Sequence, residues 1–294
     1  MNPLQRALDT LEGLSLGDAF GQCFFQEPDP DALVRRQVLP VAPWYYTDDT
    51  EMSLSVISVL SRHGSIEQDE LAYSLAQHYD YDRAYGPSMH RVLERIRNGE
   101  AWQIVGRNSF EGQGSYGNGA AMRAAPLGAY YAVDIERAAS EAALSAEVTH
   151  AHPEGIAGAV AVAVAAALAW QSRGRSLTHE GLLAAVAAFL PSSEVRSKIE
   201  RAAGMYKSSW QFAASVLGNG VGMSAQDTVP YALWCCGQAP DDWEQALWLA
   251  VGSGGDRDTL GAIAGGVITA RLGVAALPKD WLARREALPD WHLS

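Results

Sequence analysis

The chain has 294 residues, with 22 lysines and arginines against 34 aspartates and glutamates, which gives a formal net charge of −12. Apolar residues make up 48% and charged residues 19%, so the composition excludes a disordered chain, which has few apolar residues and many charges. The negative charge argues against nucleic-acid binding through a broadly basic surface, because a protein with this net charge repels phosphate. The length suits one large domain or two small ones.

The location of the protein is predicted from three features. Three cysteines do not make a disulfide framework, and the N-terminus lacks the apolar core of a signal peptide. The uncharged run Gly155–Trp170 is rich in alanine and valine and is shorter than the roughly 20 apolar residues of a membrane span. We therefore expect a buried core helix there rather than a membrane helix, in a cytoplasmic protein.

Apolar residues recur at helical spacing, beginning with Leu4, Leu8, Leu11 and Leu14, whereas no alternating strand pattern stands out. Glycine and proline concentrate in the segments between the predicted helices, and no linker divides the chain. We expect one compact all-α domain over residues 1–294. The further predicted helices are Thr50–Leu60, Asp69–Tyr79, Ser88–Arg97, Ile135–Glu147, Glu154–Gln171, His179–Phe189, Glu194–Lys207, Asp241–Val251 and Thr259–Leu272.

Two distant segments have a similar composition. Thr47–Thr50 reads Thr-Asp-Asp-Thr before one predicted helix, and Gly255–Thr259 reads Gly-Asp-Arg-Asp-Thr at the start of another. Such residues suit helix capping, and Asp48 with Glu51 has the spacing of a capping box. Each segment alone is therefore interpreted either as a helix cap or as part of a site.

Taken together, the two segments favour a metal site. If the two helix starts meet in the fold, four carboxylates converge, and like charges that close cannot all stay ionised without a cation. Oxygen ligands suit Mg²⁺, Mn²⁺ or Ca²⁺ rather than zinc. Six oxygen-bearing side chains exceed what one Mg²⁺ usually takes, so we expect a site for two metal ions.

A third segment, Gly112–Gly119, has four glycines in eight residues. Its backbone is open to close approach, and its N–H groups, which lead towards a helix start, can hold a phosphate. A flexible surface loop is the alternative interpretation. The segment is neither a Walker A nor a dinucleotide-binding motif, because it lacks Gly-Lys-Ser/Thr and no strand precedes it. Arg123, just beyond it, is interpreted either as a phosphate contact or as a structural ion-pair partner.

A fourth segment, Thr149–Glu154, contains two histidines with one residue between them. Two such histidines can bind a metal, but no third nitrogen or sulfur ligand lies nearby. A structural role is therefore favoured over a zinc site.

The order of these segments resembles that of the ADP-ribosylglycohydrolase family, the ADP-ribosylhydrolases similar to dinitrogenase-reductase-activating glycohydrolase. The resemblance runs from about residue 10 to residue 273, and five motifs in one order are far more specific than any one of them. The motifs are Gly17-Asp18-Ala19-Phe20-Gly21, Thr47-Asp48-Asp49-Thr50, Gly114-Ser115-Tyr116-Gly117-Asn118-Gly119-Ala120-Ala121-Met122-Arg123, Thr149-His150, and Gly254-Gly255-Asp256-Arg257-Asp258-Thr259-Leu260-Gly261-Ala262-Ile263-Ala264-Gly265.

The resemblance implies an all-α domain with two Mg²⁺ or Mn²⁺ ions at the base of a cleft. Asp48, Asp49 and Asp256 are the implied catalytic residues. The glycine loop would hold the diphosphate of ADP-ribose, an aromatic pair would sandwich its adenine, and a histidine would line the same pocket. The implied metal ligands are Thr47, Asp48, Asp49, Asp256, Asp258 and Thr259, and the implied substrate-binding residues are Phe110, Gly114, Ser115, Tyr116, Gly117, Asn118, Gly119 and His150.

One departure from the family concerns a glutamate on a mobile loop. The serine-directed enzymes carry it eight residues after the first glycine of the Gly-Asp motif, where this chain has Phe25. Position 22, acidic in some relatives, is Gln22, and Glu27 follows two residues after Phe25. Glu27 is therefore a candidate for a gating or proton-handling role, with a solvated loop acid as the alternative.

The resemblance implies a metal-dependent hydrolase that cleaves the glycosidic bond between ADP-ribose and its acceptor and releases ADP-ribose. The loop looks most like that of the serine-directed and O-linked branch. The alternatives are an arginine-directed hydrolase and a non-catalytic ADP-ribose-binding protein on the same scaffold. An all-α phosphohydrolase is disfavoured because the sequence has no His-Asp dipeptide. We expect an ADP-ribose-bearing substrate as partner, no membrane, no nucleic acid, and a monomer.

Overall fold

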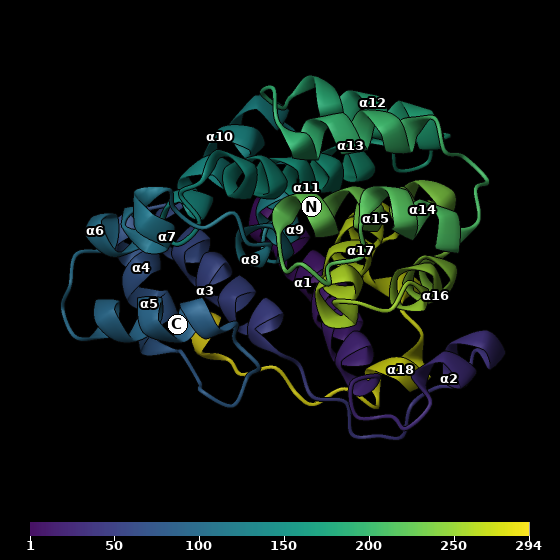
Figure 1. The fold of residues 1–294 in the computed structure, drawn as a ribbon, viewed down its shortest axis with the longest axis horizontal. Coiled ribbons are helices and arrows are strands. Elements are labelled where there is room, and N and C mark those ends of the chain that lie inside the picture. Colours follow the sequence, from purple (N-terminus) through teal and green to yellow (C-terminus); the bar gives the residue numbers. More distant parts are fainter. Residues whose placement is uncertain (294) are drawn as a thin grey trace.

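The computed structural model describes residues 1–293, which form α-helices and short 3₁₀ turns, with isolated β-bridges but no β-strand in that range (Figure 1). The all-α prediction is confirmed. The helices are α1 (Pro3–Cys23), α2 (Pro30–Arg36), α3 (Asp48–His63), α4 (Gln68–Gln77), α5 (Pro87–Arg97), α6 (Trp102–Arg107), α7 (Ser109–Gly112), α8 (Gly119–Met122), α9 (Ala125–Tyr130), α10 (Ile135–Glu147), α11 (Pro153–Gln171), α12 (His179–Ala188), α13 (Glu194–Ala203), α14 (Trp210–Leu217), α15 (Ala225–Gln238), α16 (Trp243–Gly252), α17 (Arg257–Leu272) and α18 (Lys279–Leu282), with 3₁₀ turns at Val274–Ala276 and Trp291–Leu293.

Helices α1 and α17 touch through their backbones at the centre of the fold. A Cβ atom added at Gly17 of α1 would lie 2.1 Å from the carbonyl oxygen of Gly261 in α17, and one added at Gly265 would lie 2.3 Å from that of Gly13. Glycine is needed at these positions because no side chain fits between the two helices. This contact fixes Asp18, which follows Gly17 in α1, relative to the start of α17.

Helix α11 is the predicted alanine-rich core helix. It is long and apolar enough for a membrane span by composition, but 72% of its most apolar window is buried, which is the burial expected of a core helix. It packs against α9, α10, α15 and α17. Helices α12 and α13 cover it at the top of Figure 1.

The sequence pattern missed several helices. Helix α15 contains Pro230 and is buried on most of its faces, so it has neither an uninterrupted pattern nor an amphipathic one. Helix α14 was also missed, and α2 and α7 lie in segments that we expected to be connections. In α7, Phe110 and Glu111 have φ angles of 53° and 59°, a left-handed conformation that composition does not reveal.

The C-terminal segment returns to the N-terminal half of the molecule. From α18 it crosses below the other helices, as the yellow trace in Figure 1 shows, and ends against α3. Leu288 and Trp291 of this segment pack against Leu54 and Ile57 of α3 and their neighbours. The segment therefore lies close to the start of α3, where the acidic residues are found.

Candidate active-site cleft

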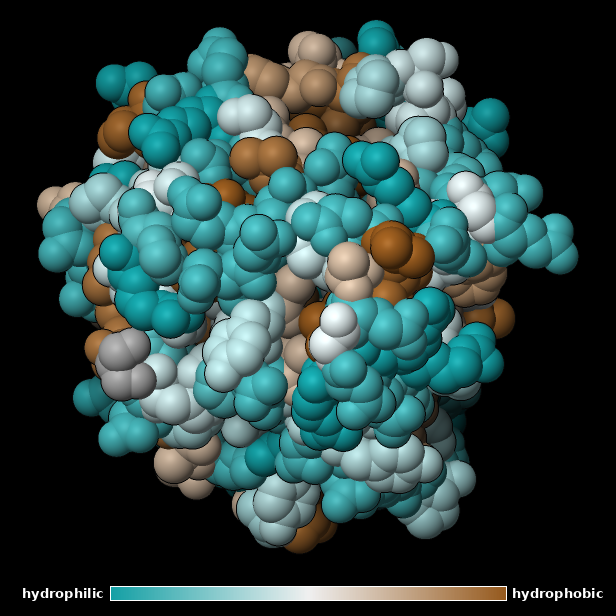
Figure 2. All heavy atoms as spheres, turned by 90° about the vertical axis from the view of Figure 1, so that its left-hand side faces the viewer, coloured by the Kyte–Doolittle hydropathy of each residue, from teal (hydrophilic) through white to brown (hydrophobic). Residues whose placement is uncertain are grey.

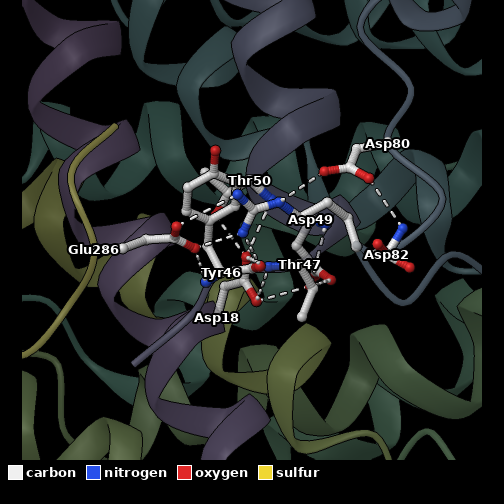
Figure 3. A network of polar contacts seen from close by, with 9 residues as sticks. Asp18, Tyr46, Thr47, Asp49, Thr50, Asp80, Asp82 and Glu286 are labelled. Atoms are coloured by element: carbon white, nitrogen blue, oxygen red, sulfur yellow. Dashed lines mark hydrogen bonds and ion pairs between the residues drawn. The ribbon is translucent and has the colours of Figure 1, made fainter. Parts of the chain in front are cut away.

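The start of α3 is built around the buried carboxylate of Asp18. This carboxylate accepts hydrogen bonds from the backbone N–H and the hydroxyl groups of Thr47 and Thr50, at 2.5 to 3.2 Å (Figure 3). Burial raises the pKa of Asp18 to about 6, against the opposing effect of these hydrogen bonds. Asp18 lay in a motif that the sequence singled out, but it was not predicted as a site residue.

Thr47 is the N-cap of α3, as one interpretation of the segment predicted. Its hydroxyl also donates to Asp49 Oδ2 at 3.0 Å, while Asp49 Oδ1 is buried without a hydrogen-bond partner. The capping-box prediction for Asp48 and Glu51 is wrong, because Asp48 lies inside the helix. Glu51 instead accepts a hydrogen bond from the Tyr85 hydroxyl at 2.6 Å.

The start of α17 supplies the second set of carboxylates. Asp256 is the N-cap residue, and its Oδ2 accepts a hydrogen bond from the Asn118 side-chain amide at 2.6 Å. Its backbone N–H donates to the carbonyl oxygen of Asn219 at 3.1 Å. Asp258 Oδ1 accepts from the Thr259 N–H at 2.9 Å. The glycine loop is therefore joined directly to this acidic helix start.

The two acidic segments meet in the fold. This is the condition on which the predicted metal site depended. Asp48, Asp256, Asp258 and Thr259 line one cleft of about 370 Å³, whereas Thr47 and Asp49 lie buried outside its lining. Burial, followed by repulsion from neighbouring aspartates, raises the pKa values of Asp48, Asp49 and Asp258 well above the usual range. Among residues 1–293, no three His, Cys, Asp or Glu side chains are grouped closely enough to form a ready metal cluster.

The glycine loop forms another wall of the cleft. Ser115, Tyr116, Gly117, Asn118 and Gly119 all line it, and the backbone of the loop pairs with the Met223–Ala225 segment through an isolated bridge. Gly114 does not line this cleft. Its φ of 76° and its contact with the backbone of residues 151–152 explain the glycine there.

His150 packs against the glycine loop. A Cβ atom at Gly119 would lie 2.8 Å from the His150 ring, so the loop needs glycine to lie this close to it. Nδ1 of His150 is 2.7 Å from the Thr149 hydroxyl. Burial, followed by the nearby Arg123 guanidinium, lowers the pKa of His150 to about 3. His150 is therefore a neutral residue that lines the cleft.

Arg123 has a structural role instead of contacting a ligand. Its side chain is fully buried and donates to the carbonyl oxygen of Ser145 at 2.8 Å and to the Thr149 hydroxyl at 3.1 Å. It does not line the cleft, and its partners are neutral groups rather than the ion-pair partner that we considered. The other histidine of the fourth segment, His152, caps α11 by accepting from the Glu154 N–H.

Phe110 and Tyr116 form the expected aromatic pair at the cleft. Their ring centroids are 5.9 Å apart with planes inclined by 33°, which is a direct aromatic contact. The two residues are 48% and 40% exposed, so both rings are partly open to solvent at the cleft. Glu27, by contrast, is half-buried and does not line the cleft.

The cleft wall formed by the start of α5 was not predicted from the sequence. Gly86, Pro87, Ser88, Met89 and Arg91 line the cleft there. Among residues 1–293, Arg91 is the only arginine or lysine in the lining, and no ion pair or hydrogen bond with another residue of that range engages its side chain. The Gly-Pro pair before a helix was a visible signal for a helix start, but not for a wall of the cleft.

The face on which α4–α7 lie is largely hydrophilic, with scattered apolar side chains (Figure 2).

The protein is therefore of the all-α class, and two acidic helix starts and a glycine-rich loop line one of its clefts. The chain belongs to the ADP-ribosylglycohydrolase family, because a sequence model of that family matches residues 1–293. This membership confirms the resemblance that the sequence motifs indicated.

Curated relatives and a solved structure agree with this assignment. The chain is 30% identical to the ADP-ribosylhydrolase ARH3 of Homo sapiens, over 95% of this chain and 88% of that protein. It is 28% identical to the uncharacterized protein YegU of Escherichia coli (strain K12), over 97% of this chain and 92% of that protein. A solved structure described as an ADP-ribosylglycohydrolase-related protein complex superposes with a TM-score of 0.66 at 25% identity, covering 97% of this chain and 93% of that one.

Proposed function

We propose that the protein hydrolyses the glycosidic bond between ADP-ribose and its acceptor and releases free ADP-ribose. The observation that carries the proposal is the shared cleft, in which the carboxylates of α3 and α17 and the glycine loop line one cavity. Membership of the family and the ADP-ribosylhydrolase relatives support the same reaction. The substrate is an ADP-ribose-bearing protein or small molecule.

Two Mg²⁺ or Mn²⁺ ions are the cofactors that we propose for the acidic part of the cleft. The donor set fits, because all of its side-chain donors are oxygens and the buried Asp49 Oδ1 has no other partner. When bound, the ions supply Lewis-acid polarisation of the ribose hydroxyl groups and of the attacking water. The residues proposed to hold them are Thr47, Asp48, Asp49, Asp256, Asp258 and Thr259.

The carboxylates also suit the charge that develops during the reaction. The bond between the anomeric carbon and the acceptor breaks, water adds its hydroxyl group to that carbon, and its proton goes to the acceptor. Positive charge builds on the ribose in the transition state. Asp48, Asp256 and Asp258 face the cleft, where fixed negative charge stabilises the developing cation.

The rest of the cleft supplies binding energy away from the reacting carbon. The backbone N–H groups of the glycine loop suit the diphosphate, and Arg91 offers a positive charge in a protein whose net charge is −12. Phe110 and Tyr116 stack on the adenine once their rings separate. Such remote contacts hold the reacting ribose in place beside the carboxylates.

For the acceptor, we propose an O-linked ADP-ribose, with modified serine as the first choice. The support is the Gly-Ser-Tyr-Gly-Asn-Gly loop together with the Phe110–Tyr116 contact. An arginine-linked acceptor is the competing assignment. Glu27 has no role in this proposal, because it does not line the cleft.

The test uses matched peptides that carry ADP-ribose on serine or on arginine, incubated with purified protein and Mg²⁺. Free ADP-ribose is measured by mass spectrometry, with Asp258→Asn and an EDTA-treated sample as controls. We expect release from the serine peptide that is lost in both controls. Release only from the arginine peptide would overturn the acceptor assignment. Binding of ADP-ribose without any release would overturn the hydrolase and indicate a non-catalytic ADP-ribose-binding protein.

A further inference from the structure

The C-terminal segment places one carboxylate beside the acidic start of α3. Trp44 N–H donates to the Arg284 carbonyl oxygen at 2.8 Å, and Glu286 N–H donates to the Trp44 carbonyl oxygen at 3.0 Å. These two backbone hydrogen bonds fix residue 286 next to Tyr46, the residue that precedes Thr47. Figure 3 shows Glu286 and Tyr46 beside Asp18 and Thr47, although Glu286 lies 239 positions after Thr47 in the sequence.

The Glu286 carboxylate accepts hydrogen bonds from two residues of this region. Its Oε1 accepts hydrogen bonds from Tyr46 N–H at 3.0 Å and from Arg83 Nη1 at 2.5 Å. Arg83 also donates to the Tyr46 carbonyl oxygen at 3.0 Å and lies over the Tyr46 ring, 3.8 Å from its centroid. The side chains of Arg83 and Glu286 are only 20% and 23% exposed, so this pair is held more firmly than an ion pair in open solvent.

Arg83 connects Glu286 to the cleft through its backbone. The Arg83 carbonyl oxygen accepts a hydrogen bond from Asp48 N–H at 2.8 Å. Ala84 and Gly86, which follow Arg83, line the cleft. The side chain of Glu286 therefore fixes, through Tyr46 and Arg83, both the segment that presents Thr47–Asp49 and the adjacent rim of the cleft.

We propose that Glu286 is a positioning residue for the Thr47–Asp49 segment. It acts through Arg83 and Tyr46 and does not itself line the cleft. The inference rests on the proposed function, since it assigns Thr47–Asp49 to one side of a metal site. Its physical basis is that groups that orient metal ligands alter the affinity for the metal even without contacting it.

A neighbouring ion pair provides a matched control. Arg285 Nη2 lies 3.0 Å from Glu12 Oε2 of α1, so this pair also anchors the C-terminal segment, but no hydrogen bond connects Glu12 to Thr47–Asp49. A purely structural role for the segment predicts similar losses from Glu286→Ala and Glu12→Ala. A positioning role predicts that only Glu286→Ala alters the site.

The experiment measures Mn²⁺ binding to the full chain by titration calorimetry. We expect Glu286→Ala to weaken Mn²⁺ binding about tenfold and Glu12→Ala to leave it within twofold of the wild type. Glu286→Gln, which keeps the shape of the side chain and can still accept a hydrogen bond from Tyr46 N–H, replaces Glu286→Ala if that variant does not fold, and we expect a smaller loss in the same direction. Equal affinities in the wild type and a folded Glu286 variant would overturn the proposal.

Hydrogen–deuterium exchange provides a second measurement that needs no metal. In metal-free protein, we expect Glu286→Ala to speed exchange in residues 44–50 and 80–86, and Glu12→Ala to leave these segments unchanged. If the wild type binds no Mn²⁺, the metal part of the proposed function fails, and this measurement alone decides the positioning role. Unchanged exchange in both segments would then overturn it.

Discussion

The side-chain amide of Asn118 donates a hydrogen bond to the Asp256 carboxylate at 2.6 Å and another to the Thr228 hydroxyl at 3.0 Å. Asn118 belongs to the glycine loop, and Asp256 is the N-cap of α17. The loop that we propose for the diphosphate and the carboxylate that we propose for the metal are therefore held by one amide group. A movement of the glycine loop therefore displaces the Asp256 carboxylate, and a movement of the carboxylate displaces the loop.

Asn118→Ala tests this connection. Without the amide, Asp256 Oδ2 loses a hydrogen bond to a charged group, which is worth about 1.5–3 kcal/mol. We expect kcat/KM for ADP-ribose release to fall about 10- to 100-fold, measured by steady-state kinetics. Asn108→Ala removes an exposed asparagine outside the cleft lining and should leave kcat/KM unchanged. Equal values for wild type and Asn118→Ala would show that the connection has no effect on the reaction.

Gly119→Ala tests the close packing of the glycine loop on His150. The added Cβ atom would lie 2.8 Å from the ring, and forced shifts in such packed positions cost about 1–3 kcal/mol. We expect a lower melting temperature by calorimetry and weaker ADP-ribose binding. Gly86→Ala is the matched control, because Gly86 lines the same cleft but an added Cβ atom has no neighbour within 4 Å. Identical behaviour of the two variants would contradict the steric explanation.

The buried His150 predicts a particular pH dependence of stability. Its pKa is lowered to about 3 in the folded state, against about 6.5 when unfolded. Below pH 6.5 the unfolded chain binds a proton that the folded chain does not, so this residue's contribution to stability is present above pH 6.5 and is lost as the pH falls. At pH 5 the loss is about 2 kcal/mol.

Urea unfolding of the wild type and His150→Gln at pH 7.5 and pH 5 measures this contribution. We expect the wild type to lose about 2 kcal/mol more than the variant between the two values, because every other titrating group is common to both. Parallel losses would mean that His150 is protonated in the folded protein near its ordinary pKa.

Arg91→Gln tests the proposed contribution of a positive charge to diphosphate binding. An exposed charge pair is worth about 0.2–1 kcal/mol, so we expect ADP-ribose affinity to fall by up to about fivefold at low salt, with adenosine binding unchanged. Arg95→Gln is the control on the same helix, because Arg95 is paired with Glu100 at 2.6 Å and does not line the cleft. An equal effect on adenosine would contradict a role at the diphosphate.

Much of the fold followed from periodicity, and the exceptions have physical causes. Helix α10 (Ile135–Glu147) was predicted with its observed bounds, because its apolar positions follow one face and Asp134 caps it. Helix α15 was missed because Pro230 interrupts it and most of its faces are buried. The pairing of α1 with α17 could not be predicted. Glycines at four-residue spacing indicate a close helix contact, but they do not show which other helix makes it.

The site followed from the motifs only in part. Local sequence placed Asp48 and Asp256 at helix starts, but only the fold brings Asp256 into contact with Asn118 across 138 residues. Asp18 was missed as a site residue because a buried acid that accepts hydrogen bonds from four donor groups leaves no local signal. Glu286 was missed for the same reason, because its partners Tyr46 and Arg83 are distant in the sequence.

In the proposed function, the acidic helix starts and the glycine loop act as one binding site. Calorimetric titration of ADP-ribose into the protein, with and without saturating Mn²⁺, measures whether they do. We expect Mn²⁺ to tighten ADP-ribose binding about tenfold, and ADP-ribose to tighten Mn²⁺ binding equally, since coupling between two ligands is reciprocal. Asp256→Asn should abolish the coupling. Tight binding of both ligands with no mutual effect would contradict a single site.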